Sequence, residues 1–157
     1  MKIYTYPSTL VMGIVIAASA FAQNIIVTNS WVRATVQGQK ATGAFMTVTA
    51  KENAKLVAAS TPVAGITEIH EMKMDKDVMQ MAALPNGLDL PAGKAVDLKP
   101  GGFHIMLMDL KMPLSKDTTV PITLTFQDAT GKKTQQVVQI PVSNQAPAGQ
   151  AMGDHKH

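Results

Sequence analysis

The sequence predicts an all-β sandwich made of one domain. Nine short segments that are apolar or alternate between apolar and polar residues recur along the chain, separated by turn-forming residues. This spacing is typical of a β-sandwich. No stretch after residue 22 shows the sustained 3.6-residue period of a long helix. The nine segments are residues 25–34, 43–50, 56–59, 66–72, 78–84, 95–98, 103–110, 120–127 and 134–142.

Each segment owes its limits to turn chemistry, because Gly, Pro, Asn and Asp favour turns over strands. In chain order the turn signals are Gln37-Gly38, Pro62, Asp75-Lys76-Asp77, Pro85-Asn86-Gly87, Pro91-Ala92-Gly93, Pro100-Gly101-Gly102, Pro113 and Asp128-Ala129-Thr130-Gly131. One alternative stays open at this stage. Residues 51–60 are rich in Ala, so they could form a helix on an α+β domain.

The first 22 residues are predicted to be a secretory signal peptide that is cleaved before Gln23. Lys2 supplies a positive start, residues 10–20 form a short apolar run, and Ala20 and Ala22 are the small residues that a signal peptidase needs. The apolar run is about half as long as a membrane span. No cysteine follows it, which argues against a lipid anchor. We expect an exported, periplasmic protein without stable membrane insertion.

The remaining chain divides into a domain, residues 23–142, and a tail, residues 143–157. The domain is large enough for one hydrophobic core. Without Lys2, which is removed with the signal, the chain has 13 Lys and Arg and 11 Asp and Glu. These charged residues are dispersed along the sequence. This pattern does not indicate a nucleic-acid partner. The tail begins with polar and small residues that bury little apolar area, so we expect it to be disordered.

The chain has no cysteine. Stability must therefore come from packing rather than disulfides. Thiol exchange, cysteine nucleophiles and cysteine-rich zinc sites are excluded. A blue-copper electron-transfer centre is excluded too, because it needs a cysteine ligand.

Soft and borderline metal ligands are concentrated in the middle of the chain. Thioether sulfur suits Cu(I), and imidazole accepts copper in either oxidation state, so the cluster points to copper. Its eight members are His70, Met72, Met74, Met79, Met81, His104, Met106 and Met108.

Strand alternation separates these side chains into rows. In residues 103–108, Phe103, Ile105 and Leu107 form a core row, while His104, Met106 and Met108 form the other row. Upstream, His70, Met72 and Met74 share a row of one strand. A returning strand after the turn at residues 75–77 carries Met79 and Met81 together. Alternation alone selects His104 and Met106 and leaves the choice among the other methionines open.

Ten residues separate His70 from Met81, and the pair His104-x-Met106 follows after a loop. This spacing resembles the signature of the periplasmic PCuAC copper chaperones. Three further segments also resemble that family, and the likeness covers residues 24–142. They are Trp31-Val32-Arg33-Ala34-Thr35, Gly43-Ala44-Phe45-Met46-Thr47-Val48 and Leu98-Lys99-Pro100-Gly101-Gly102-Phe103-His104-Ile105-Met106-Leu107. One departure is visible. The family pattern has 21 residues between the methionine and the second histidine, whereas 22 separate Met81 from His104. A loop rich in Pro and Gly can absorb the difference.

The resemblance implies a cupredoxin-like Greek-key β-sandwich with a Cu(I) site made of His70, Met81, His104 and Met106. It also implies delivery of copper to cytochrome c oxidase assembly, either to the subunit II copper centre or through a Sco-type partner. Met- and His-containing tails occur in the family, so Met152, His155 and His157 are candidates for a secondary site that captures Cu(II).

The other candidates have plainer interpretations. Met46, Met79, Met108 and Met112 are expected to pack rather than bind metal, because methionine is an adaptable core residue. Glu71 and Asp109 are expected to be solvated charges, although either could orient a ligand histidine. Scattered serines and two histidines better used as ligands do not form a catalytic set, so we do not expect an enzyme. A copper-sequestering resistance protein and a metal-free interaction sandwich remain alternatives to the chaperone.

Overall fold

The computed structural model describes residues 24–148. Within that range the chain forms ten strands and no α-helix. The strands are β1 (Ile25–Arg33), β2 (Ala41–Ala50), β3 (Ala54–Ser60), β4 (Ala64–Asp75), β5 (Val78–Ala83), β6 (Leu88–Leu90), β7 (Ala95–Leu98), β8 (Phe103–Leu110), β9 (Thr119–Asp128) and β10 (Lys133–Ser143).

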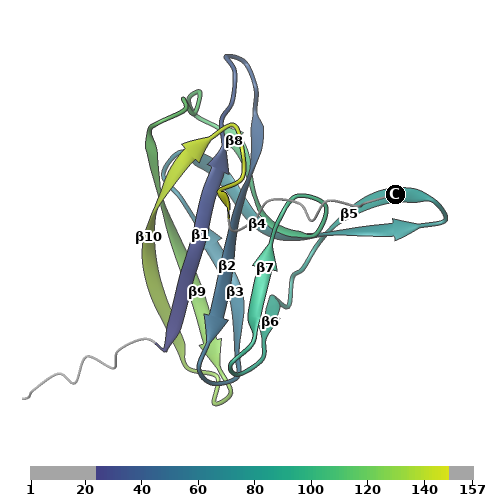
Figure 1. Ribbon diagram of the computed structural model, residues 1–157, viewed down its shortest axis with the longest axis vertical. Helices are drawn as coiled ribbons and strands as arrows, with labels where there is room; N and C mark the ends of the chain where they lie inside the picture. Colours follow the sequence, from purple (N-terminus) through teal and green to yellow (C-terminus); the bar gives the residue numbers. More distant parts are fainter. Residues whose placement is uncertain (1–23, 149–157) are drawn as a thin grey trace, which may run out of the picture.

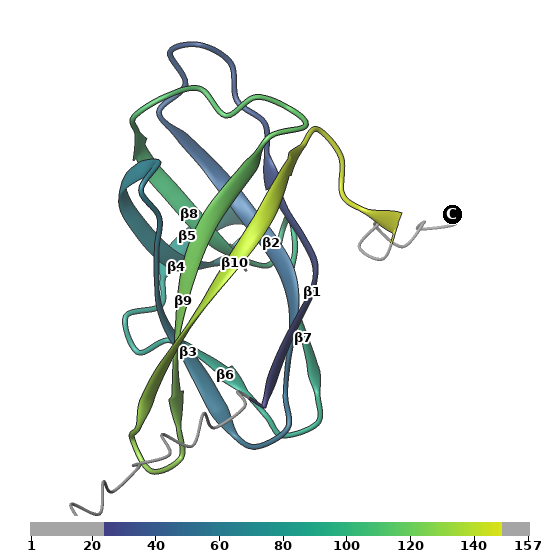
Figure 2. The same ribbon diagram turned by 90° about the vertical axis from the view of Figure 1, so that its left-hand side faces the viewer.

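The strands form one continuous sheet that folds over into two layers (Figure 1). Their order is β5-β4-β8-β7-β2-β1-β10-β9-β3-β6, with β8 also paired to β2. The layers join where β1 pairs in parallel with β10, at Val32–Val142 and Arg33–Ser143. Figure 2 shows β9 and β10 crossing in front of β2 and β8. The predicted all-β sandwich is therefore confirmed.

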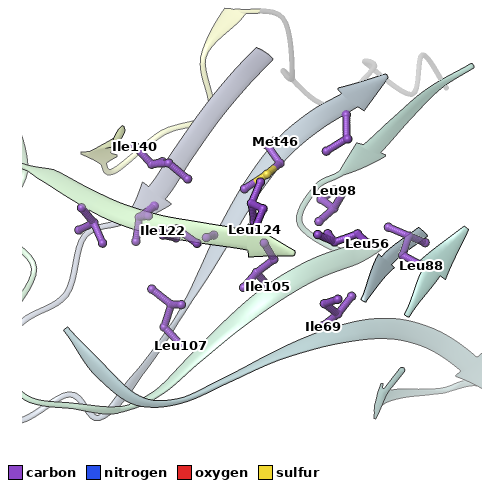
Figure 3. Packing of buried hydrophobic residues seen from close by; sticks show 14 of the residues in the cluster. Met46, Leu56, Ile69, Leu88, Leu98, Ile105, Leu107, Ile122, Leu124 and Ile140 are labelled. Atoms are coloured by element: carbon purple, nitrogen blue, oxygen red, sulfur yellow. The ribbon is translucent and has the colours of Figure 1, made fainter. Parts of the chain in front are cut away.

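The core lies between the layers and follows strand alternation. Ile122 and Leu124 of β9 face Met46, Ile105 and other buried residues of the opposite layer (Figure 3). All four are 0% exposed. Met46 is thus a packing methionine, as predicted.

The strand pattern was predicted well and was incomplete in one place. All nine predicted segments overlap observed strands, but the short strand β6 was not expected because turns flank its three residues. The alternative helix at residues 51–60 is wrong. Strand β3 occupies this stretch and pairs with β9, and its Leu56 is buried in the core.

The predicted signal peptide lies outside the described residues, as does residue 149 onward of the tail. In the described range the chain contains no helix that is long and apolar enough to cross a membrane.

Strands β4 and β5 form a hairpin that extends beyond the sandwich body, to the right in Figure 1. The predicted turn at residues 75–77 closes it, with Lys76 at φ 48° and Asp77 at φ 64°. Two successive residues with positive φ match the turns that suit the twist of a two-residue hairpin loop. The turn therefore fixes which residues of β4 and β5 face each other.

Candidate metal centre

The candidate ligands lie on the outer face of the layer that contains β4, β5 and β8. On β8, Ile105 and Leu107 point into the core and are 0% exposed. Neighbouring strand residues point to opposite sides, so His104, Met106 and Met108 point outward, as alternation predicted. Strand β8 thus separates a packed inner face from an outer face of imidazole and thioether.

The two histidines are direct neighbours across strands. His70 of β4 pairs in register with His104 of β8, and their ring centroids are 5.6 Å apart. Although they face away from the core, His70 is 8% exposed and His104 is 5% exposed. Two nearly buried imidazoles therefore meet on the outer face.

Hydrogen bonding leaves one ring nitrogen of His70 without a partner. Its Nε2 lies 2.7 Å from a carboxylate oxygen of Glu68, which can only accept, so Nε2–H is the donor. The Nδ1 atom is buried and has no hydrogen-bond partner in the structure. Buried polar atoms are seldom left unpaired. Glu68 orients the ring through Nε2, and Nδ1 is therefore the atom of His70 that can bind a metal ion.

His104 is held through its other nitrogen. Nδ1–H donates to the carbonyl oxygen of Gly102 at 3.2 Å, which leaves Nε2 as the available donor to a metal. Burial lowers the pKa of His104 and the nearby His70 lowers it further, against a raising effect of the Gly102 hydrogen bond. A lowered pKa keeps the ring neutral, as a metal ligand must be.

Thioethers complete the surroundings in a cleft of about 300 Å³. His104, Met106, Met72 and Met81 all line this cleft. Met72 and Met81 face each other across β4 and β5, and Met81 is 48% exposed. The hairpin thus brings Met72 and Met81 near the histidine pair, and Met81 is open to solvent.

An aromatic pair on β1 and β2 lies next to His104. The Trp31 and Phe45 rings of β1 and β2 stack with centroids 4.7 Å apart, and Phe45 lies 6.3 Å from His104. The Arg33 guanidinium covers both rings at 5.8 Å and 5.5 Å. Gly43 lies opposite Met106, and a Cβ there would meet the Phe45 ring at 2.7 Å. Glycine therefore lets the ring pack close to the cleft.

Of the four predicted ligands, the structure places His104, Met106 and Met81 on one cleft and His70 directly beside His104. Their role as ligands stays a prediction. Met152, His155 and His157 lie outside the described residues.

Among the subsidiary expectations, the packing of two methionines was wrong, and the alternative roles of two carboxylates as histidine partners are not observed. Met79 and Met112 do not pack in the core, since they are 47% and 55% exposed. Glu71 does not orient a histidine; it pairs with Lys73 at 3.0 Å on the other face of β4. Asp109 is an exposed charge, as expected, and is next to Gly65 rather than to either histidine.

Sequence reasoning missed three contributors to the site. Glu68 could have been found, because it is two residues before His70 and so shares its row. Met72 was in that row but was not selected. Phe45 gave no local signal, because only the pairing of β2 with β8 brings it to His104.

The other large pocket is a poorer candidate for a copper site. This pocket of about 900 Å³ is formed by polar loop residues such as Asn53, Asp89 and Asp128, and its described lining contains neither His nor Met. Residues 24–148 contain no group of three or more His, Cys, Asp or Glu side chains suited to a metal ion.

Comparison with known proteins supports the assignment of the domain. Residues 25–142 match the family model described as "LpqE-like: Putative lipoprotein LpqE-like". A putative lipoprotein of Leifsonia xyli, Lxx21020, is 34% identical over 107 residues, which are 68% of this chain. The match spans 64% of that relative, less than two thirds of its length.

Solved structures show the same fold. The apo PCuAC domain of PmoF1 superposes with a TM-score of 0.60 at 23% identity, covering 79% of this chain and 95% of that domain. The Cu(I) form of DR1885 from Deinococcus radiodurans gives 0.52 at 31% identity, covering 80% of this chain and 83% of that one. The cupredoxin-like fold is confirmed by these likenesses.

Proposed function

This chain belongs to the LpqE-like family of PCuAC-type domains, and from that premise we propose that it is a copper chaperone that binds Cu(I) through His70, Met81, His104 and Met106. One observation carries the proposal: His104 lines the cleft of the outer face together with Met72, Met81 and Met106, and the buried His70 lies directly beside His104. The relative DR1885 has a structure with Cu(I), which supports the same cargo here.

The donor set fits Cu(I) chemically. Two thioethers and two neutral imidazoles carry no charge, and soft thioether ligands favour Cu(I). The unpaired Nδ1 of His70 and the free Nε2 of His104 are each fixed by a hydrogen bond at the opposite ring nitrogen. Such outer contacts orient a ligand ring and strengthen its binding. Both rings are therefore ready to bind before the ion arrives.

The same site allows release. Met81 is 48% exposed, so a thiolate of an acceptor protein can approach the ion and replace one thioether at a time. The buried histidines hold the ion meanwhile. An ion that is held and yet exchangeable suits a carrier rather than an enzyme.

The proposal extends to location and partners. The family is described as lipoprotein-like, and the named relative is a putative lipoprotein. Both descriptions support an exported, periplasmic protein. We place the acceptor in cytochrome c oxidase assembly, as the subunit II copper centre or a Sco-type protein. Met152, His155 and His157 would add Cu(II) capture.

A transfer assay tests this function. The Cu(I)-loaded full chain is mixed with an apo subunit II domain or an apo Sco-type protein, and the copper content of each is measured after separation. We expect copper to move to the acceptor. Copper that stays on the chain with both acceptors would instead indicate a sequestering protein, and a chain that binds no Cu(I) would indicate a metal-free interaction domain.

A further inference from the structure

The β4–β5 hairpin carries four methionines on one face, in two directly opposed pairs. Met72 faces Met81, and Met74 faces Met79 two residues nearer the turn. Opposed residues on antiparallel strands point to the same side, with Cβ atoms about 4.5–5.5 Å apart. The four thioethers therefore share one small area, continuous with the row that contains His70.

Core packing does not explain the outer pair. Met74 is 66% exposed and Met79 is 47% exposed, whereas the core residue Met46 is 0% exposed. All six residues of β5 are exposed, and in the described sheet β5 is the edge strand next to β4. Because apolar side chains are stabilised mainly by leaving water, these methionines contribute little to folding.

The two faces of the hairpin differ in chemistry. The face opposite the methionines carries the Glu71–Lys73 ion pair at 3.0 Å. The positive φ angles of Lys76 and Asp77 fix the register, so a shift that would exchange the faces is opposed. The grouping of the thioethers is thus built into the hairpin.

We propose that Met74 and Met79 form a second Cu(I) site near the turn of the hairpin, with Met72 as a third thioether. Neutral thioethers suit Cu(I), and the flexible methionine side chain lets sulfur atoms from neighbouring pairs converge on one ion. Met72 and Met81 also line the cleft, so an ion bound at the turn can reach the histidines by exchanging one thioether at a time. This exposed site is the place where the ion enters. The inference takes its metal from the proposed function, but it depends on different residues.

The experiment is an anaerobic Cu(I) titration of the full chain, followed by NMR of the methionine methyl groups and by mass spectrometry of the intact complex. We expect the first equivalent to shift Met106 and the second to shift Met74 and Met79. The double variant Met74→Leu/Met79→Leu should bind one Cu(I) fewer. Met112→Leu is the matched control, because Met112 is 55% exposed outside the hairpin, and it should bind as many ions as the unmodified chain.

The outcomes separate the two sites. Equal stoichiometry in the double variant and the unmodified chain, or a second ion that shifts only Met152, would overturn the hairpin site and leave the cleft unaffected. Conversely, shifts of Met74 and Met79 without any shift of Met106 would support the hairpin site and contradict the proposed function.

Discussion

Glu68 accepts a hydrogen bond from Nε2–H of His70 at 2.7 Å, and this contact fixes which nitrogen of His70 can bind a metal ion. The two residues are two positions apart on β4 and point to the same side. Glu68 is partly exposed, with 45% of its side-chain surface accessible. The bond is therefore a positioning contact beside the cleft rather than part of the core.

The first prediction concerns this contact. Glu68→Gln keeps the size of the side chain and removes its charge, so His70 loses a charged acceptor. Loss of such an outer contact typically weakens metal binding about 10–100-fold, and partial exposure places the expected loss near tenfold. A competition titration with a Cu(I) chelator measures it. Glu71→Gln is the control on the other face of β4, and equal affinities for both variants would contradict the assigned role.

The second prediction separates the two opposed methionines of the cleft. The family spacing selects Met81, although Met72 lies directly opposite and lines the same cleft. Met81→Leu should lower Cu(I) affinity by about tenfold or more, which is about 1.4 kcal/mol. Met72→Leu should lower it less. A larger loss in Met72→Leu, seen in the same chelator competition, would transfer the ligand role to Met72.

The third prediction is the pH dependence of the metal-free protein. Burial lowers the pKa of His104 in the folded state, whereas the pKa of a histidine in the unfolded chain is about 6.5. Below that pH the unfolded chain binds more protons, so this contribution to stability is present above about pH 6.5 and is lost as the pH falls toward the folded pKa. We expect the melting temperature to decline over that window. His104→Gln should weaken the decline, and an unchanged profile would refute the explanation.

The fourth prediction concerns Gly43, which is one of the residues that line the cleft. In Gly43→Ala the new Cβ would lie 2.7 Å from Phe45 Cζ, and such overpacking typically costs about 1–3 kcal/mol. Urea unfolding should show a loss of that size, accompanied by weaker Cu(I) binding as the ring moves toward His104. Adding Phe45→Leu should recover the binding. A single variant with unchanged stability and affinity would show that the site tolerates the extra carbon.

The sequence was sufficient for most of the fold because the strands are short and separated by clear turn residues. Alternation on β8 predicted that Ile105 and Leu107 are core residues and that His104 and Met106 face outward. Strand β6 was missed because Leu88–Leu90 is too short to show a period. The sequence of β3 is rich in Ala and left strand and helix both open. The strand forms because Leu56 packs in a core whose other members are distant in sequence.

The site could be predicted only in part, because alternation gives the face of a residue and not its neighbour. The opposition of His70 and His104 and that of Met72 and Met81 depend on strand register. The exposure of Met79 was mispredicted for a related reason, since the hairpin extends beyond the sandwich and leaves β5 at an edge. Register and edge position are properties of the assembled sheet.

Copper K-edge spectroscopy of the full chain, loaded with less than one equivalent of Cu(I), tests the central claim most directly. At that loading the tighter cleft site should fill first. The account predicts two sulfur and two nitrogen donors around the ion, with one nitrogen lost in His104→Gln and one sulfur lost in Met106→Leu. A shell without sulfur would contradict it. A shell that lacks nitrogen and stays the same in both variants would also contradict it.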